Sequence, residues 1–138
     1  CVDYRSSSFV DELRAATPNG VDVNFENVGG PVMDAVLSQL NTFGRVPLCG
    51  LVSQYNATEP YPLPNVAALL WKRIKLQGFI VSDRMDRWPQ ALADLSAWVA
   101  EGKIRYHETI AHGIEGAPEA FFGMLRGKNL GKQIVKLV

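Results

Sequence analysis

The feature that most constrains the fold is a repeated alternation between strand-like and helix-like patterns over residues 21–100. Strands place apolar residues at every second position, whereas amphipathic helices place them three and four residues apart. The predicted strands are residues 21–25, 45–49 and 74–81, and the predicted helices are residues 31–40, 66–73 and 88–100. Because the connections are short, this order predicts an α/β fold with a doubly wound parallel sheet and helices on both faces.

The two ends of the chain extend this pattern. A helix is expected after Ser8, which has the chemistry of an N-cap, and it ends before Pro18. Asn41 to Gly44 is expected to close the helix at residues 31–40, and Asn65 to cap the helix that follows it. The last segment predicts strands at residues 104–110 and 132–138 around a helix at residues 117–125. These strands alternate more sharply, so a domain boundary is expected near Gly102, between residues 1–101 and 102–138.

Composition indicates a folded protein with no strong electrostatic field. The chain has 138 residues, of which 47% are hydrophobic and 20% charged, and 14 basic residues balance 14 acidic ones. This balance favours neither nucleic acid nor an anionic membrane as a partner. No apolar run approaches the ~18 residues of a membrane-spanning helix, and no leader is visible, so a cytoplasmic location is expected.

Two features of the termini and cysteines add expectations. The chain begins with Cys1 in a strand-like stretch and lacks an initial methionine, which predicts the carboxyl-terminal part of a longer protein. Cys1 and Cys49 are the only cysteines, and neither lies near His107 or His112 in sequence. A structural zinc site is therefore not expected, whereas a disulfide stays open.

Polar residues gather where the central strand ends. Gly50 interrupts an apolar run, and Ser53, Gln54 and Tyr55 follow in a loop. Ligands of parallel α/β sheets bind beyond the carboxyl ends of the strands, so this loop is a candidate site. The alternative interpretation is a buried strand followed by an ordinary turn.

Five separated segments together resemble one known family. They are VDVNFENVGG, GRVPLCGLVSQYN, RIKLQGFIV, ALADLSAWVAEGKI and GAPEAFFGMLRGKNLGKQIVKLV. In this order and spacing they are similar to the carboxyl-terminal part of the zinc-independent medium-chain dehydrogenase/reductases. The subgroup they resemble is the prostaglandin reductase or leukotriene B4 12-hydroxydehydrogenase type, which includes the bacterial curcumin reductases.

This resemblance implies a function and a domain plan. The function is NADPH-dependent reduction of the conjugated C=C bond of α,β-unsaturated ketones or aldehydes, with hydride transferred to the β-carbon. The plan places residues 1–101 in a Rossmann-like NADP-binding domain and residues 102–138 in a returning segment of a GroES-like catalytic domain. The glycine-rich phosphate-binding turn is expected upstream of Cys1, and a homodimer is implied.

The resemblance also assigns site residues. Tyr55 is the implied catalytic residue, because a phenol can hydrogen-bond a ribose hydroxyl or a developing enolate oxygen. Tyr4 and Arg5 match the place that contacts the 2′-phosphate of NADP(H), and no metal ligand is implied. The full set implied to bind the cofactor is Tyr4, Arg5, Asn27, Cys49, Gly50, Ser53, Tyr55, Phe79, Ile80, Val81 and Asn129.

Alternative interpretations remain for the function and for several residues. The alternatives to an enone reductase are a quinone reductase of the same superfamily and a module that binds cofactor without turnover. His107 and His112 are interpreted as structural or solvent-facing, and the three tryptophans as packing anchors. The basic cluster Lys72, Arg73 and Lys75 is expected to cap a helix end.

Overall fold

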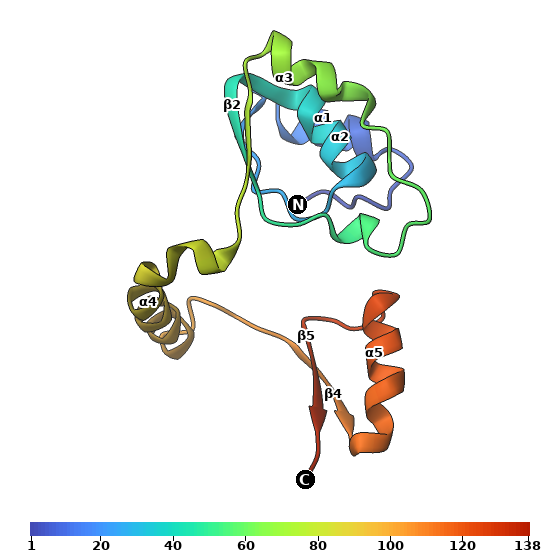
Figure 1. Cartoon of the computed structure of the whole chain (residues 1–138), viewed down its shortest axis with the longest axis vertical. Helices are drawn as coiled ribbons and strands as arrows, with labels where there is room; N and C mark the ends of the chain where they lie inside the picture. Colours follow the sequence, from blue (N-terminus) through green and yellow to red (C-terminus); the bar gives the residue numbers. More distant parts are fainter. The chain divides into compact units, whose positions relative to one another are not determined.

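A three-stranded parallel sheet organises the first part of the chain. The computed structural model describes residues 1–138 and separates into two units, Cys1–Met85 and Asp86–Val138 (Figure 1). In the first unit the sheet order is β1 (Val21–Val23), β2 (Leu40–Leu48), β3 (Lys75–Gly78). Both strand pairs are parallel, and Val46 of β2 is in register with Leu76 of β3. The predicted parallel α/β fold is therefore confirmed.

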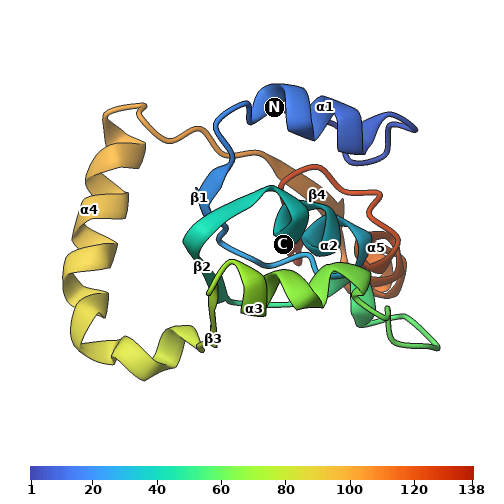
Figure 2. The same cartoon turned by 90° about the horizontal axis from the view of Figure 1, so that it is seen from above.

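Helices complete the first unit. They are α1 (Phe9–Ala16), α2 (Gly30–Gln39) and α3 (Ala68–Trp71), with short 3-10 turns at Val52–Gln54 and Pro64–Ala67. The turn at Pro64–Ala67 runs directly into α3, so a 3-10 turn followed by a short α-helix stands where one helix was expected (Figure 2).

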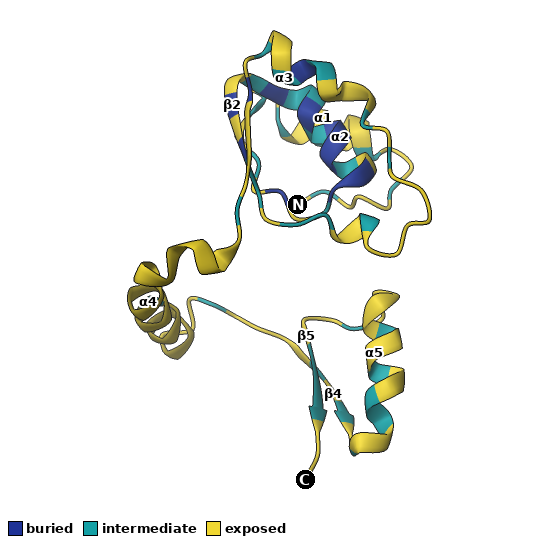
Figure 3. Ribbon diagram, viewed as in Figure 1, coloured by how far each residue is buried: buried dark blue, intermediate teal, exposed yellow.

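The hydrophobic core lies between α2, β2 and the start of α3. Leu37 and Leu40 are each 1% exposed and Val46 is 0% exposed, and they cluster with Met33, Ala68 and Ile74. Figure 3 shows the buried positions along α2 and β2. Burying each such side chain contributes about 1.5–3 kcal/mol, so this cluster fixes α2 on the sheet.

The central strand begins earlier than the sequence predicted. Residues 41–44 were expected to close α2, but β2 already begins at Leu40, which pairs with Val21. Asn41 Nδ2 donates to the Asn19 carbonyl at 3.0 Å and to Asp22 Oδ1 at 2.8 Å. These contacts join residues that are distant in sequence and extend the strand. Local sequence patterns therefore do not predict them.

Of the two predicted caps, Ser8 is at the N-cap position of α1 but without a side-chain capping bond, and Asn65 is wrong. Ser8 makes no side-chain capping bond, and its hydroxyl donates instead to Glu12 Oε1 at 2.6 Å. Asn65 does not cap α3, because its side chain donates to Asp34 Oδ2 at 2.8 Å. In both cases the side chain donates to a carboxylate, a strong acceptor, which orients it away from the helix N–H groups that a cap would bind.

The expected basic cap at a helix end is present. Lys72 Nζ donates to the carbonyls of Ser38 at 2.9 Å and Leu40 at 2.7 Å, where α2 ends. Arg73 Nη1 donates to the Trp71 carbonyl at the end of α3. Cations at these positions complement carbonyls that have no partner within the helix.

The second unit is a β–α–β arrangement preceded by a long helix. Its elements are α4 (Trp88–Ala100), β4 (Glu108–His112), α5 (Ala117–Leu125) and β5 (Lys132–Lys136). β4 and β5 are parallel, with Ile110 opposite Ile134. The bounds of α4 and α5 match the predicted helices. No residue of this unit is buried, and no helix of the chain combines the length and apolarity needed to cross a membrane.

One predicted strand is shorter in the structure, and another is displaced. β3 ends at Gly78, because Asp83 accepts from the Ile80 N–H at 3.0 Å and turns the chain. The strand predicted at residues 104–110 is instead β4 at Glu108–His112. The two units divide before Asp86, whereas the sequence placed a domain boundary near Gly102. The assignment of residues 102–138 to a catalytic domain stays a prediction.

Candidate functional site

The loops after β1 and β2 lie against each other. We call residues 24–29 the β1 loop and residues 49–63 the β2 loop. The Glu26 carbonyl accepts from the N–H groups of Cys49 at 2.8 Å and Gly50 at 3.3 Å. The Asn27 carbonyl accepts from Val52 at 3.0 Å. Main-chain bonds therefore join the two loops at the carboxyl ends of neighbouring strands, where ligands of parallel sheets bind.

Gly50 is a point of close approach between these loops. A Cβ atom at this position would collide with Asn27 Oδ1 and would lie 3.2 Å from the Tyr55 hydroxyl. The missing side chain therefore allows Asn27 and Tyr55 to approach one another over the Gly50 backbone. Three predicted site residues, from two loops, are brought together here, and the Tyr55 side chain is 70% exposed.

The glycine pair at the start of α2, Gly29 and Gly30, faces the β2 loop. A Cβ at Gly30 would lie 2.9 Å from both Ser53 Oγ and Gln54 Nε2, and one at Gly29 would meet the Leu51 side chain at 2.9 Å. Gly29 and Gly30 have φ of 75° and 57°, a region that larger residues adopt only with strain. The tight approach of the two loops thus requires glycine at both positions.

The end of β3 continues the same edge. The Phe79 N–H donates to the Leu48 carbonyl at 3.1 Å, and its ring packs edge-on against Phe25 with centroids 5.8 Å apart. Ile80 and Val81 follow and are exposed. Phe79, Ile80 and Val81 therefore follow the carboxyl end of β3, the strand that neighbours β2.

The remaining predicted residues have local contacts. The Arg5 guanidinium carbon lies 5.6 Å from the Tyr4 ring centroid, so these two side chains pair with each other. Cys49 is exposed as a free thiol, and its N–H bonds the β1 loop. Asn129 belongs to the second unit, where its Nδ2 donates to the Gly131 carbonyl at 2.7 Å.

Sequence reasoning missed two buried carboxylates. Glu26 is 3% exposed and Asp34 is 7% exposed. Each accepts several hydrogen bonds, which offset the cost of burying a charge. The position of Glu26, just before a glycine pair and a helix, was the available signal, because anions favour helix N-termini. Asp34 carries no such signal, since its partner Asn65 lies far along the chain.

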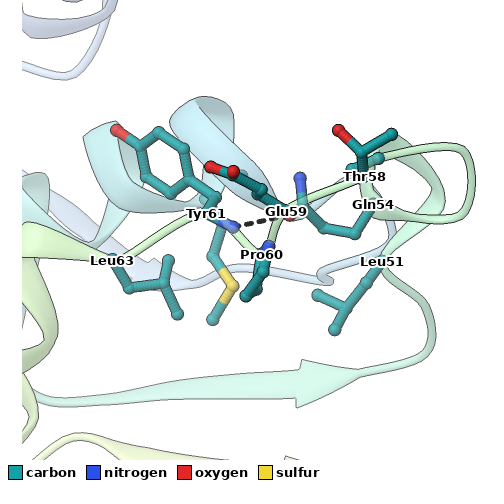
Figure 4. Close-up of a pocket in the computed structure, with 10 residues that line it drawn as sticks. Leu51, Gln54, Thr58, Glu59, Pro60, Tyr61 and Leu63 are labelled. Atoms are coloured by element: carbon teal, nitrogen blue, oxygen red, sulfur yellow. Dashed lines mark hydrogen bonds between the residues drawn. The ribbon is translucent and has the colours of Figure 1, made fainter.

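A pocket opens between α2 and the β2 loop (Figure 4). Its volume is about 370 Å³. Gln54 Oε1 accepts from the Tyr61 N–H at 2.9 Å and closes the loop across it. The walls are mostly apolar, with a few polar groups, which is typical of sites for small organic molecules. The lining residues of the loop include Leu51, Gln54, Thr58, Glu59, Pro60, Tyr61 and Leu63.

Metal ligation has no candidate in this chain. No three side chains among His, Cys, Asp and Glu lie close enough together to hold an ion. A protein zinc site needs at least three such ligands. The residues of this chain therefore do not fit a metal centre of their own.

Comparison with known proteins decides the family. A family model described as zinc-binding dehydrogenase matches residues 1–135. The chain belongs to this family. The description of the family names zinc, but this chain has no group of side chains that could hold a zinc ion.

Individual relatives narrow the resemblance. The chain is 47% identical to the NADPH-dependent curcumin reductase of Escherichia coli, with 99% of the chain and 41% of that protein covered. It is 47% identical to prostaglandin reductase 1 of Rattus norvegicus, with 97% and 42% covered. The crystal structure of CurA from Vibrio vulnificus in complex with NADPH matches with a TM-score of 0.89 and 48% identity, covering 100% of this chain and 43% of CurA.

These matches confirm the branch of the family that the sequence predicted. The chain spans about two fifths of the length of the relatives it matches.

Proposed function

We propose that this chain is part of an NADPH-dependent oxidoreductase that reduces the conjugated C=C bond of α,β-unsaturated ketones or aldehydes. The observation that carries the proposal is the meeting of Asn27, Gly50 and Tyr55 at the carboxyl ends of adjacent parallel strands. The similarity to a curcumin reductase, a prostaglandin reductase and an NADPH-bound CurA supports the cofactor and the substrate class.

The cofactor site is proposed to use the edge formed by the three strands. When bound, NADPH supplies the hydride that reduces the β-carbon, and a proton added to the α-carbon completes reduction. The bare backbone at Gly50 gives a ligand close access, and the Asn27 amide can donate and accept. The proposed cofactor site is completed by Cys49, Ser53 and the segment Phe79 to Val81.

Tyr55 is the proposed catalytic residue. Its hydroxyl can donate a hydrogen bond to a ribose hydroxyl or to the oxygen on which the enolate charge develops. Its 70% exposed side chain leaves the hydroxyl accessible to a ligand. The protein's contribution is therefore orientation and charge stabilisation rather than nucleophilic attack.

Selectivity for NADPH over NADH is proposed to come from residues outside the carboxyl-end edge of the sheet. Tyr4 and Arg5 offer a phenol and a guanidinium side by side, which suits a 2′-phosphate dianion. Asn129 is proposed to contact the cofactor from the second unit. We further propose zinc-independent chemistry in a homodimer located in the cytoplasm, with neither nucleic acid nor membrane as partner. The two free cysteines are compatible with a reducing compartment.

The test is cofactor oxidation by the full-length protein that contains this chain. NADPH and NADH are each mixed with a small alkenal, a conjugated ketone or a benzoquinone, and absorbance at the nicotinamide band is followed. We expect rapid NADPH oxidation with the alkenal or the ketone. We also expect a product in which the C=C bond is saturated. Turnover with benzoquinone alone would favour a quinone reductase. Tight NADPH binding with no oxidation would favour a non-catalytic module.

A further inference from the structure

The buried carboxylate of Glu26 sits between the residues of the proposed cofactor site without being one of them. We propose that Glu26 is a positioning residue, which fixes the β1 loop so that Asn27 meets Gly50 and Tyr55. This inference rests on the proposed function, since it concerns the affinity of the same site for NADPH.

The side chain of Glu26 shapes the turn that leads into α2. Oε1 accepts from the N–H groups of Val28 and Gly29, both at 2.7 Å, and Oε2 accepts from Asn24 Nδ2 at 2.7 Å. With 3% exposure, Glu26 is shielded from bulk solvent. The carboxylate therefore holds the chain on both sides of Asn27 in one conformation.

The main chain of Glu26 fixes the β2 loop at the same time. Its N–H donates to the Pro47 carbonyl at 2.9 Å, and its carbonyl accepts from Cys49 and Gly50. One residue thus connects the turn that carries Asn27 with the strand end that carries Gly50. Loss of the side chain would leave the strand pairing intact and release the turn.

The outward direction of Asn27 follows from the inward direction of Glu26. Neighbouring residues in extended chain point to opposite sides, and Asn27 is exposed while Glu26 is buried. Asn27 Oδ1 lies against the Gly50 backbone. If the turn rotates, Asn27 leaves this position, and the site loses one of its two side-chain walls.

Asp34 provides a matched control within the same unit. It is also a buried carboxylate, at 7% exposure, and it accepts from the N–H and Nδ2 of Asn65 at 2.7 and 2.8 Å. These bonds hold the turn before α3 on α2, and Asn65 lies outside both loops. Removing either carboxylate should therefore cost stability, whereas only Glu26 should affect the cofactor.

The experiment compares Glu26→Met, Glu26→Gln and Asp34→Leu in the full-length protein. Met and Leu remove the acceptors but keep similar volume. Gln keeps one oxygen for Val28 and Gly29, and the Asn24 amide can rotate to accept from the new NH2 group. Melting temperature, NADPH affinity by nicotinamide fluorescence, and KM for an enone are measured well below unfolding.

Glu26→Met should raise the NADPH Kd about tenfold or more, whereas Glu26→Gln and Asp34→Leu should keep it within about threefold. The enone KM should change little in all three. A Glu26→Met protein that binds NADPH like the wild type, or an Asp34→Leu protein that loses NADPH affinity equally, would overturn the proposal.

Two further outcomes are distinguishable. If Glu26→Met does not fold, Glu26→Asp carries the test, because its carboxylate is one methylene shorter and cannot keep all three bonds; unchanged NADPH affinity would then contradict the proposal. A wild-type protein that binds no NADPH would refute the proposed function itself and this inference with it, whereas normal wild-type binding with unaffected variants refutes the inference alone.

Discussion

Tyr55 is the residue at which the proposed chemistry is tested most directly. Tyr55→Phe removes one hydroxyl from an exposed ring and leaves the core untouched. If this hydroxyl stabilises the reacting centre by ~1–3 kcal/mol, kcat of the full-length protein should fall roughly tenfold to a hundredfold, with an unchanged melting temperature. Tyr106→Phe, an exposed tyrosine of the second unit, is the control. An unchanged kcat would dismiss the catalytic role of Tyr55.

Glu12 gives a residue-scale prediction about pH. Hydrogen bonds from Ser8 and then Ser6 lower the pKa of its carboxyl group. A lowered pKa in the folded state means that the stabilising contribution is present above the unfolded pKa and is lost as pH falls through the folded pKa. Ser8→Ala should raise the pKa of Glu12, measured by NMR titration of glutamate side-chain carbons. Ser7→Ala should leave it unchanged, and an equal effect of both would contradict the assignment.

At the scale of elements, the lysine that ends α2 is a strong test of packing. Lys72 Nζ donates to two carbonyls from a partly buried position. Lys72→Met keeps the aliphatic stem but leaves both carbonyls without this donor, so the free energy of unfolding should fall by about 1–3 kcal/mol in urea denaturation. Lys75→Met, at an exposed site on β3, should change it by less than ~0.5 kcal/mol. An equal loss of unfolding free energy in both variants would show that removal of a positive charge, and not of the bonds to the two carbonyls, causes the effect.

Elements whose signals are local could be predicted from the sequence. The apolar period and an early proline set the bounds of α4 and α5. The stretch before β4 could not be predicted, because Gly102 turns at φ 70° and the N–H of Ile104 donates back to the Trp98 carbonyl. The Ile104 N–H therefore bonds the last turn of α4, although the residue type of Ile104 suits a strand.

At the candidate site too, some residues could be predicted from the sequence and others could not. Asn27, Gly50 and Tyr55 were predicted as site residues from matched segments of sequence, and the structure places them close together, while their role stays a prediction. Glu26 and Asp34 were missed because the burial of a carboxylate depends on partners supplied by the fold. Glycine pairs and loop polarity reveal where a ligand approaches, whereas the groups that hold a loop in place become visible only with its contacts.

At the scale of the whole molecule, the sheet has two unpaired edges, β1 and β3. Free backbone groups on edge strands recruit further strands, so we predict that the isolated 138-residue chain self-associates through one edge. The Asn24 N–H donates to the Arg45 carbonyl and the Phe79 N–H to the Leu48 carbonyl. Because N–H directions alternate along a strand, those of Val23 and Gly78 point to the free edges.

Proline substitution separates the two edges. Val23→Pro and Gly78→Pro each remove one outward N–H, and one of the two should shift sedimentation toward the monomer while the other does not. A wild-type chain that sediments as a monomer at high concentration would contradict the prediction.

The uneven distribution of buried side chains has a consequence for how long each part of the chain stays closed. Every buried residue lies between Glu26 and Ile74, whereas β4, α5 and β5 hold their hydrogen bonds without a buried side chain. Amide protons exchange with solvent through local openings, whose free energy grows with the apolar contacts that must be broken. In the chain taken alone, deuterium should therefore enter β4 and β5 long before it reaches the amides of α2 and β2. Slow exchange in the second unit would then be a property conferred by neighbouring surfaces and not by its own strands.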